Sequence, residues 1–136
     1  MAATIRDPEL AQLYGRALIA VARADTEIGF EEGMRLQERI DARCETPLRL
    51  EDLLFEPTLR PENLTDYTSG GPFRGAAQPA QLAEWLVADG LSVVLAKGHV
   101  THAEAKTLWR FAEALGVSRD DFRRLTASAS RWFPST

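Results

Sequence analysis

Acidic side chains gather in one short stretch near the start of the chain. Four carboxylates fall within eight residues there, those of Asp25, Glu27, Glu31 and Glu32. Their mutual repulsion lowers stability unless solvent, the positive end of a helix dipole or a bound cation offsets it. Calcium, magnesium and manganese take oxygen ligands of this kind. Acidic residues are also ordinary in the first turn of a helix, so composition alone leaves both interpretations open.

An EF-hand calcium loop does not fit this stretch. Such a loop needs oxygen donors at positions 1, 3 and 5 and a glutamate at position 12. Counted from Asp25, position 5 is Gly29 and position 12 is Leu36. A cation bound here needs a different arrangement of ligands.

A second polar stretch, 97–104, contains both histidines of the chain. His99 and His102 lie there with Lys97 and Glu104. Two imidazoles and a carboxylate can hold zinc when they converge. Exposed histidines near the start of a helix are the simpler interpretation, so zinc fits less well than a hard cation.

Helical periodicity surrounds the acidic stretch on both sides. Asp7 and Pro8 form an N-cap and a first-turn proline, and they open a helix predicted over about 8–23. A second helix is predicted from near Phe30 until Pro47 stops it. The apolar residues expected to face the core after Phe30 are Met34, Leu36, Ile40, Leu50, Leu53, Leu54 and Phe55.

The middle of the chain, 56–78, is rich in proline and glycine. It is too long for an ordinary connection. We expect a small packed helix around Pro61–Tyr67 and mobility over Thr68–Gly75. Tyr67, Phe73 and Arg74 make this stretch a candidate contact surface.

Helical signals return in the last third. A long helical element is predicted from Pro79 to Gly98, and Thr101 with Glu104 forms a capping box for the next helix. Gly116 suits the end of that helix, and Ser118 suits the start of a last one. No segment shows sustained strand alternation, so the predicted fold class is all-α.

The two helical regions match each other at an offset of 72 positions. The matched pairs are Ala24 with Ala96, Ile28 with Val100, Glu32 with Glu104, Leu36 with Leu108, Thr46 with Ser118, Leu50 with Phe122, and Leu53 with Leu125. This predicts a compact single domain, 1–136, of about six to eight helices. It consists of two pseudo-symmetric helix-loop-helix units, about 8–55 and 79–133, joined by 56–78.

Composition narrows the functional class. The chain has 136 residues and one cysteine, Cys44. It has no apolar run near the length of a membrane span and no signal-like N-terminus. We therefore expect a soluble cytoplasmic protein without a transmembrane segment. The net charge of -4 divides into -6 over 1–68 and +2 over 69–136, and no basic stripe suggests nucleic acid as a partner.

Enzyme signatures are missing from the sequence. There is no Gly-rich phosphate loop, no Ser/His/Asp order and no credible pairing of Cys44 with a histidine. A non-enzymatic protein is therefore expected, with a small hydrolase-type enzyme using paired carboxylates as the weaker alternative. The aromatic tail, Trp132 to Pro134, makes a protein-interaction module, including a homodimer, a third class.

Two segments, ALIAVARADTEIGFEEGMRL and LSVVLAKGHVTHAEAKTLWRFAEALGVS, resemble the repeated signature of the tellurite-resistance TerB family. In that signature an apolar helix ends in Ala-Asp-Gly, and a glutamate follows seven positions after the aspartate. Here Glu32 follows Asp25 by seven positions, and Glu104 follows Lys97 by seven. The resemblance spans roughly 10–54 and 80–126.

The resemblance implies two loops that lie close together and a divalent-cation patch built from Asp25, Glu27, Glu32 and Glu104. It also implies a non-enzymatic bacterial stress-response role, as a scaffold for protein partners at the cytoplasmic membrane face. Thr26 replaces the first glycine of the signature, and Lys97 replaces its second aspartate.

Lys97 leaves two hypotheses for the patch. In the first, the acidic residues bind one cation weakly, and Lys97 and His99 modulate this site. In the second, the Lys97 ammonium neutralises the acidic residues by pairing with Asp25 or Glu32.

Overall fold

The computed structural model describes residues 5–24, 27–69 and 79–132, and each structural statement below concerns these residues. The α-helices are α1 (Pro8–Ala22), α2 (Phe30–Arg43), α3 (Leu50–Leu53), α4 (Pro61–Ser69), α5 (Pro79–Val94), α6 (His102–Ala114) and α7 (Arg119–Leu125), with 3₁₀ turns η1 (Leu95–Lys97) and η2 (Ala127–Trp132). Extended pairing in the described residues is limited to one isolated bridge between Ile5 and Cys44. The predicted all-α class is therefore confirmed.

Local signals account for the ends of the helices. The Asp7 side chain accepts a hydrogen bond from the Glu9 amide at the start of α1 (3.1 Å), and Ser118 Oγ accepts one from the Asp121 amide at the start of α7 (3.1 Å). Gly98 and Gly116 follow η1 and α6 with φ of +96°, a left-handed conformation that strains any residue with a Cβ. The caps expected from the sequence are confirmed at these positions.

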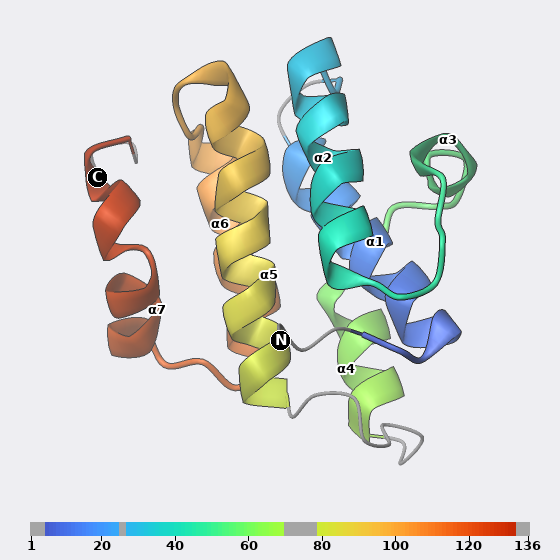
Figure 1. The fold of residues 1–136 in the computed structure, drawn as a ribbon. Helices are drawn as coiled ribbons and strands as arrows, with labels where there is room; N and C mark the ends of the chain where they lie inside the picture. The colour runs from blue at the N-terminus through green and yellow to red at the C-terminus, as the bar shows by residue number, and fades with distance from the viewer. Residues whose placement is uncertain (1–4, 25–26, 70–78, 133–136) are drawn as a thin grey trace.

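Helix α1 is the centre of the fold. It contacts α2, α3, α4, α5 and α6, and every residue of 17–22 is buried. Figure 1 shows α2 and α5 side by side at the front, with α1 and α6 behind them and α7 at the outer edge beside α5. At Gly15 a Cβ would lie 2.8 Å from Leu53 Cδ1, so a larger residue there would require the Leu53 side chain to shift.

Two residues assigned to the core from periodicity are exposed, and those assignments are wrong. Leu36 and Ile40 are buried as expected, but Met34 is 59% exposed and Phe55 is 90% exposed. Helix α2 buries only the narrow stripe of Glu32, Leu36 and Ile40, and a residue two positions before Leu36 points to the other side. Phe55 lies beyond the end of the four-residue helix α3.

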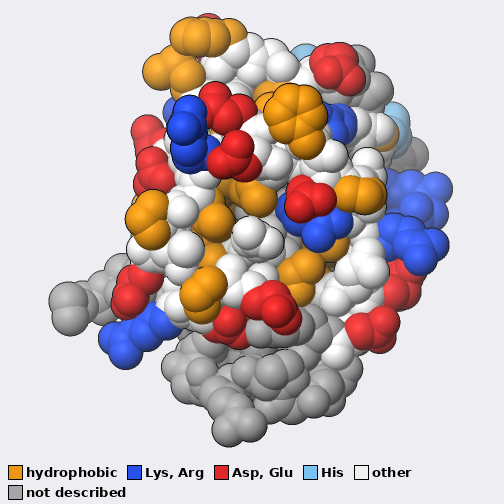
Figure 2. Space-filling model, turned by 90° about the vertical axis from the view of Figure 1, so that its right-hand side faces the viewer, with side chains coloured by type: hydrophobic (Ala, Val, Ile, Leu, Met, Phe, Trp, Pro, Cys, Tyr) orange, Lys and Arg blue, Asp and Glu red, His pale blue; other side chains and the backbone are white. Residues whose placement is uncertain are grey.

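Three large hydrophobic side chains of the described residues are exposed, those of Phe30, Met34 and Phe55. On the face shown in Figure 2, hydrophobic side chains are interspersed with acidic and basic ones, and Lys and Arg side chains gather at the right-hand edge of this face. Scattered exposed apolar residues of this kind are normal for folded proteins.

The proline- and glycine-rich stretch begins with the expected small helix, which is α4 and runs two residues beyond its predicted end. The remainder of the stretch predicted to be mobile, 70–75, lies outside the described residues, as do Phe133 and Pro134 of the aromatic tail. Within the part of the chain that is described, no helix has the length and apolar character needed to cross a membrane.

Candidate functional site

The candidate site begins with Glu32, the third residue of α2. The chain enters α2 through Gly29, which has no side chain to cap the helix. Glu32 reaches back instead, and its Oε1 accepts a hydrogen bond from the Gly29 amide (3.2 Å). This contact leaves the second oxygen, Oε2, in the interior, and the side chain is buried.

Glu104 has the matching position at the start of α6. Its Oε1 accepts a hydrogen bond from the Thr101 amide (3.0 Å), and Thr101 Oγ1 accepts one from the Glu104 amide (3.2 Å). This is the capping box predicted from the sequence, but the carboxylate is also buried. Both glutamates therefore use Oε1 for their own helix start and turn Oε2 elsewhere.

Lys97 connects the two carboxylates. Its Nζ lies 3.6 Å from Glu32 Oε2 and donates a hydrogen bond to Glu104 Oε2. Lys97 ends η1, and the left-handed Gly98 follows it before the chain enters α6. We call Glu32, Lys97 and Glu104 the Lys97 triad, and it joins the starts of α2 and α6 across a separation of 72 residues.

The triad compensates only part of the cost of burying charge. Two carboxylates face one ammonium, and the Lys97 side chain is 24% exposed. The backbone amides at the two helix starts and the positive ends of the helix dipoles supply further stabilisation. Among the described residues, however, Glu32 Oε2 accepts no hydrogen bond although it is buried.

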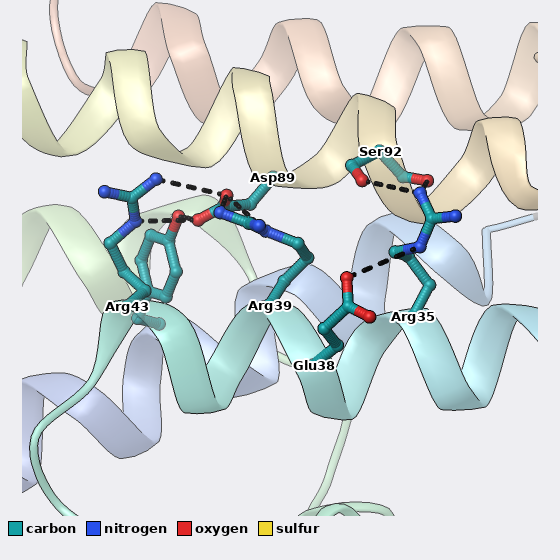
Figure 3. A network of polar contacts seen from close by, with 7 residues as sticks. Arg35, Glu38, Arg39, Arg43, Asp89 and Ser92 are labelled. Carbon is teal, nitrogen blue, oxygen red and sulfur yellow. Dashed lines mark hydrogen bonds and ion pairs between the residues drawn. The ribbon is translucent and has the colours of Figure 1, made fainter.

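A second buried charge, Asp89 on α5, is a residue that the sequence reasoning missed. Its side chain is 1% exposed and accepts hydrogen bonds from Arg39 Nε (3.0 Å), Arg43 Nε (3.0 Å) and the Tyr14 hydroxyl. Figure 3 shows how the two arginines of α2 converge on this carboxylate. We call these four residues the Asp89 network, and it joins α1, α2 and α5.

The arginine spacing on α2 is a signal that could have revealed the Asp89 network. Arg35, Arg39 and Arg43 recur every four residues and therefore form one stripe along the helix. Arg35 Nη1 donates to Ser92 Oγ (3.0 Å), one turn of α5 beyond Asp89, as Figure 3 also shows. Arg43 also stacks over the Trp85 ring at 4.8 Å. A lone aspartate inside the apolar sequence of α5 is the matching signal on the other helix.

Burial raises the pKa of two side chains in or beside the Asp89 network, Tyr14 and Cys44. Burial and then the neighbouring Asp89 raise the pKa of Tyr14 well above its usual value. Burial raises the pKa of the Cys44 thiol to about 12. Both groups stay protonated at neutral pH, so neither supplies an anionic nucleophile there.

Comparison with known proteins now assigns the chain to a family. The model of the family described as tellurite resistance protein TerB matches residues 12–127. The chain belongs to the TerB family. Its match includes the Lys97 triad and the Asp89 network, so both lie in the TerB-family domain. Searches of curated proteins and of solved structures give no match.

In the described part of this TerB-family chain, the structure brings together two of the four residues that the resemblance implied as cation ligands. Glu32 and Glu104 come together at Lys97, Glu27 is exposed, and Asp25 lies outside the described residues. His99 and His102 are both exposed. Within 5–24, 27–69 and 79–132, no group of three or more His, Cys, Asp or Glu residues is arranged to hold a metal ion. Cation binding by the predicted set stays a prediction.

Proposed function

We propose that this TerB-family chain is a non-enzymatic scaffold domain in tellurite or related stress resistance, in which Lys97 replaces a divalent cation. The observation that carries this proposal is the position of the Lys97 ammonium between the carboxylates of Glu32 and Glu104. The 72-residue offset pairs Lys97 with Asp25, so a basic residue is present where the first unit has an acidic one. A built-in cation of this kind holds the starts of α2 and α6 together without external metal.

The geometry of the triad also argues against acid-base catalysis by its carboxylates. Each glutamate accepts a backbone hydrogen bond through Oε1 and faces Lys97 through Oε2. A general acid or base must instead reach a substrate proton directly or through one water molecule. The scaffold proposal therefore assigns the triad to structure and assigns function to protein partners that dock on the folded domain.

Divalent-cation binding is the second candidate function, and one observation favours it. Glu32 Oε2 is buried and accepts no hydrogen bond from the described residues. A cation that displaced the Lys97 ammonium would contact this oxygen and Glu104, with Asp25 and Glu27 as further ligands. The Lys97 ammonium repels such a cation, so this candidate requires the lysine side chain to move.

Calorimetry separates the two candidates. The wild-type chain, Lys97→Ala and the control Lys106→Ala are titrated with calcium, magnesium, manganese and zinc. Lys106 is the only other lysine of the chain, and its side chain is exposed. The scaffold proposal expects no saturable heat from the wild type or from Lys106→Ala, and new binding of a hard cation by Lys97→Ala.

A different calorimetric result contradicts the scaffold proposal. Saturable binding by the wild type that Glu32→Gln abolishes establishes cation binding as the function of the site. The resistance role has its own test, which is tellurite tolerance of a strain lacking this protein and supplied with the wild type. Unchanged tolerance after supply of the wild type would reject that role.

A further inference from the structure

An unassigned cavity lies between α1, the segment before α4, and α6. Its volume is about 340 Å³, within the range of small-molecule sites. The residues that line it are Ala20, Arg23, Ala24, Thr58, Leu59, Arg60, Pro61, Thr107, Arg110 and Phe111. We call this the Arg23 cavity. Three of its lining residues are arginines, and its described lining includes no carboxylate.

The arginines of the Arg23 cavity differ from most other arginines of the described chain in their partners. Arginines elsewhere pair with carboxylates, as in Arg6, Arg35, Arg39, Arg43, Arg49, Arg123 and Arg124. Among the described residues no carboxylate pairs with Arg23 or Arg110, and Arg60 has only a contact of 3.9 Å with Glu62. Arg23 Nε is buried and has no hydrogen-bond partner in the described structure. A buried donor without a partner is costly, which indicates that a ligand or water completes it.

The chemistry of the lining selects an oxyanion. A guanidinium group presents N–H donors in a planar fork that matches two oxygens of a phosphate group. The hydroxyls of Thr58 and Thr107 add neutral donors, and Leu59 and Phe111 supply an apolar wall. We propose that the Arg23 cavity binds a small phosphorylated metabolite. Its phosphate group contacts the three arginines, and its organic part lies on the apolar wall.

The neighbouring surface limits the length of this ligand. The adjacent hollow shares Arg60, Pro61 and Arg110 with the cavity, but its lining also includes Glu62 and Glu113. These two carboxylates repel a polyanion that extends beyond the arginines. The charge pattern therefore favours a ligand with one phosphate group over polyphosphate or a nucleic-acid backbone. No residue of the Lys97 triad lines the cavity, so this site is independent of the proposed scaffold function.

Titration by NMR tests the proposal with three probes. The Nε–H signals of the arginine side chains are recorded in the full chain during addition of AMP, inorganic phosphate or adenosine. AMP is expected to give saturable shifts at Arg23, Arg60 and Arg110, inorganic phosphate weaker shifts at the same signals, and adenosine none.

Two variants make the NMR result specific. Arg110→Gln changes an exposed side chain and is expected to weaken AMP binding by roughly tenfold or more, since a charge-assisted hydrogen bond is lost. Arg123→Gln removes an arginine that pairs with Asp120 away from the cavity, and AMP binding is expected to be unchanged. The proposal is overturned if AMP gives no saturable shift, if Arg110→Gln binds AMP as the wild type does, or if adenosine binds equally well.

Discussion

Replacing Lys97 with methionine tests the central contact of the candidate site. Methionine keeps an unbranched side chain of similar length but removes the ammonium, so the buried carboxylates of Glu32 and Glu104 lose the cation that they share. Lys106→Met is the matched control because Lys106 is exposed and lies outside the triad. We expect Lys97→Met to unfold at a lower denaturant concentration than the wild type and the control.

The size of the effect follows from the geometry of the triad. The Nζ to Glu32 Oε2 separation of 3.6 Å corresponds to an attraction of roughly 4–5 kcal/mol at an effective dielectric constant of about 20. Glu104 adds a second, hydrogen-bonded contact. Partial exposure of Lys97 screens both contacts, and removal of the ammonium also removes its own desolvation cost. The expected net loss of unfolding free energy is about 3 kcal/mol, or about 10 °C in Tm.

Urea unfolding followed by circular dichroism measures this loss. A double-mutant cycle with Glu104→Gln isolates the contact between Lys97 and Glu104, since glutamine keeps the Oε1 acceptor for the Thr101 amide. A coupling energy of about 2 kcal/mol is expected. A loss below about 0.5 kcal/mol in Lys97→Met, the level of an ordinary surface substitution, would refute the reasoning.

The remaining predictions concern the Asp89 network and the corrected core. Asp89→Asn is expected to lower the free energy of unfolding, measured in urea, by about 3 kcal/mol, because it leaves buried donors without their charged acceptor. The control Asp120→Asn changes an exposed residue and is expected to stay within about 0.5 kcal/mol of the wild type. Equal losses in the two variants would contradict a stabilising role of the Asp89 network. Burial raises the pKa of Tyr14, so the contribution of the protonated Tyr14 hydroxyl to stability is fully present below pH ~10 and declines as the pH rises further. A difference in Tm between the wild type and Tyr14→Phe that stays constant above pH ~10 would contradict this prediction. With its pKa raised to about 12, Cys44 is expected to react with a disulfide reagent at pH ~8 at least roughly thirtyfold more slowly than in denaturant, because far less thiolate forms although each thiolate is more nucleophilic. Equal rates in the two conditions would contradict this shift. Met34→Ser is expected to change the free energy of unfolding by less than about 0.5 kcal/mol, because Met34 is exposed. A larger loss would indicate that Met34 is part of the core.

Much of the fold could be predicted because the ends of its helices depend on residues close in sequence. The capping box of Thr101 and Glu104 closes over three residues, and Gly98 and Gly116 adopt their left-handed conformation within a single turn. Such hydrogen bonds and torsions need no distant partner. The same local character explains why the helices around the candidate site lie close to their predicted positions.

Part of the candidate site was also accessible from the chain alone. The 72-residue offset placed Glu32 and Glu104 in equivalent positions and suggested that Lys97 could pair with Asp25 or Glu32. The offset did not indicate that both carboxylates are buried or that Glu104 is the closer partner of Lys97. Those features depend on how η1 and the starts of α2 and α6 pack against one another.

The sequence by itself therefore determined the all-α class and the helix caps at Asp7, Thr101 and Ser118, and the 72-residue offset aligned Glu32 with Glu104. Only the tertiary structure decided that Asp89 is buried beneath arginines of another helix, that Met34 faces solvent and that Arg23 borders a cavity. The physical reason is the distance along the chain over which each kind of interaction acts. Capping and turn preferences act within a few residues, whereas burial and ion pairing depend on which distant helix surfaces pack together.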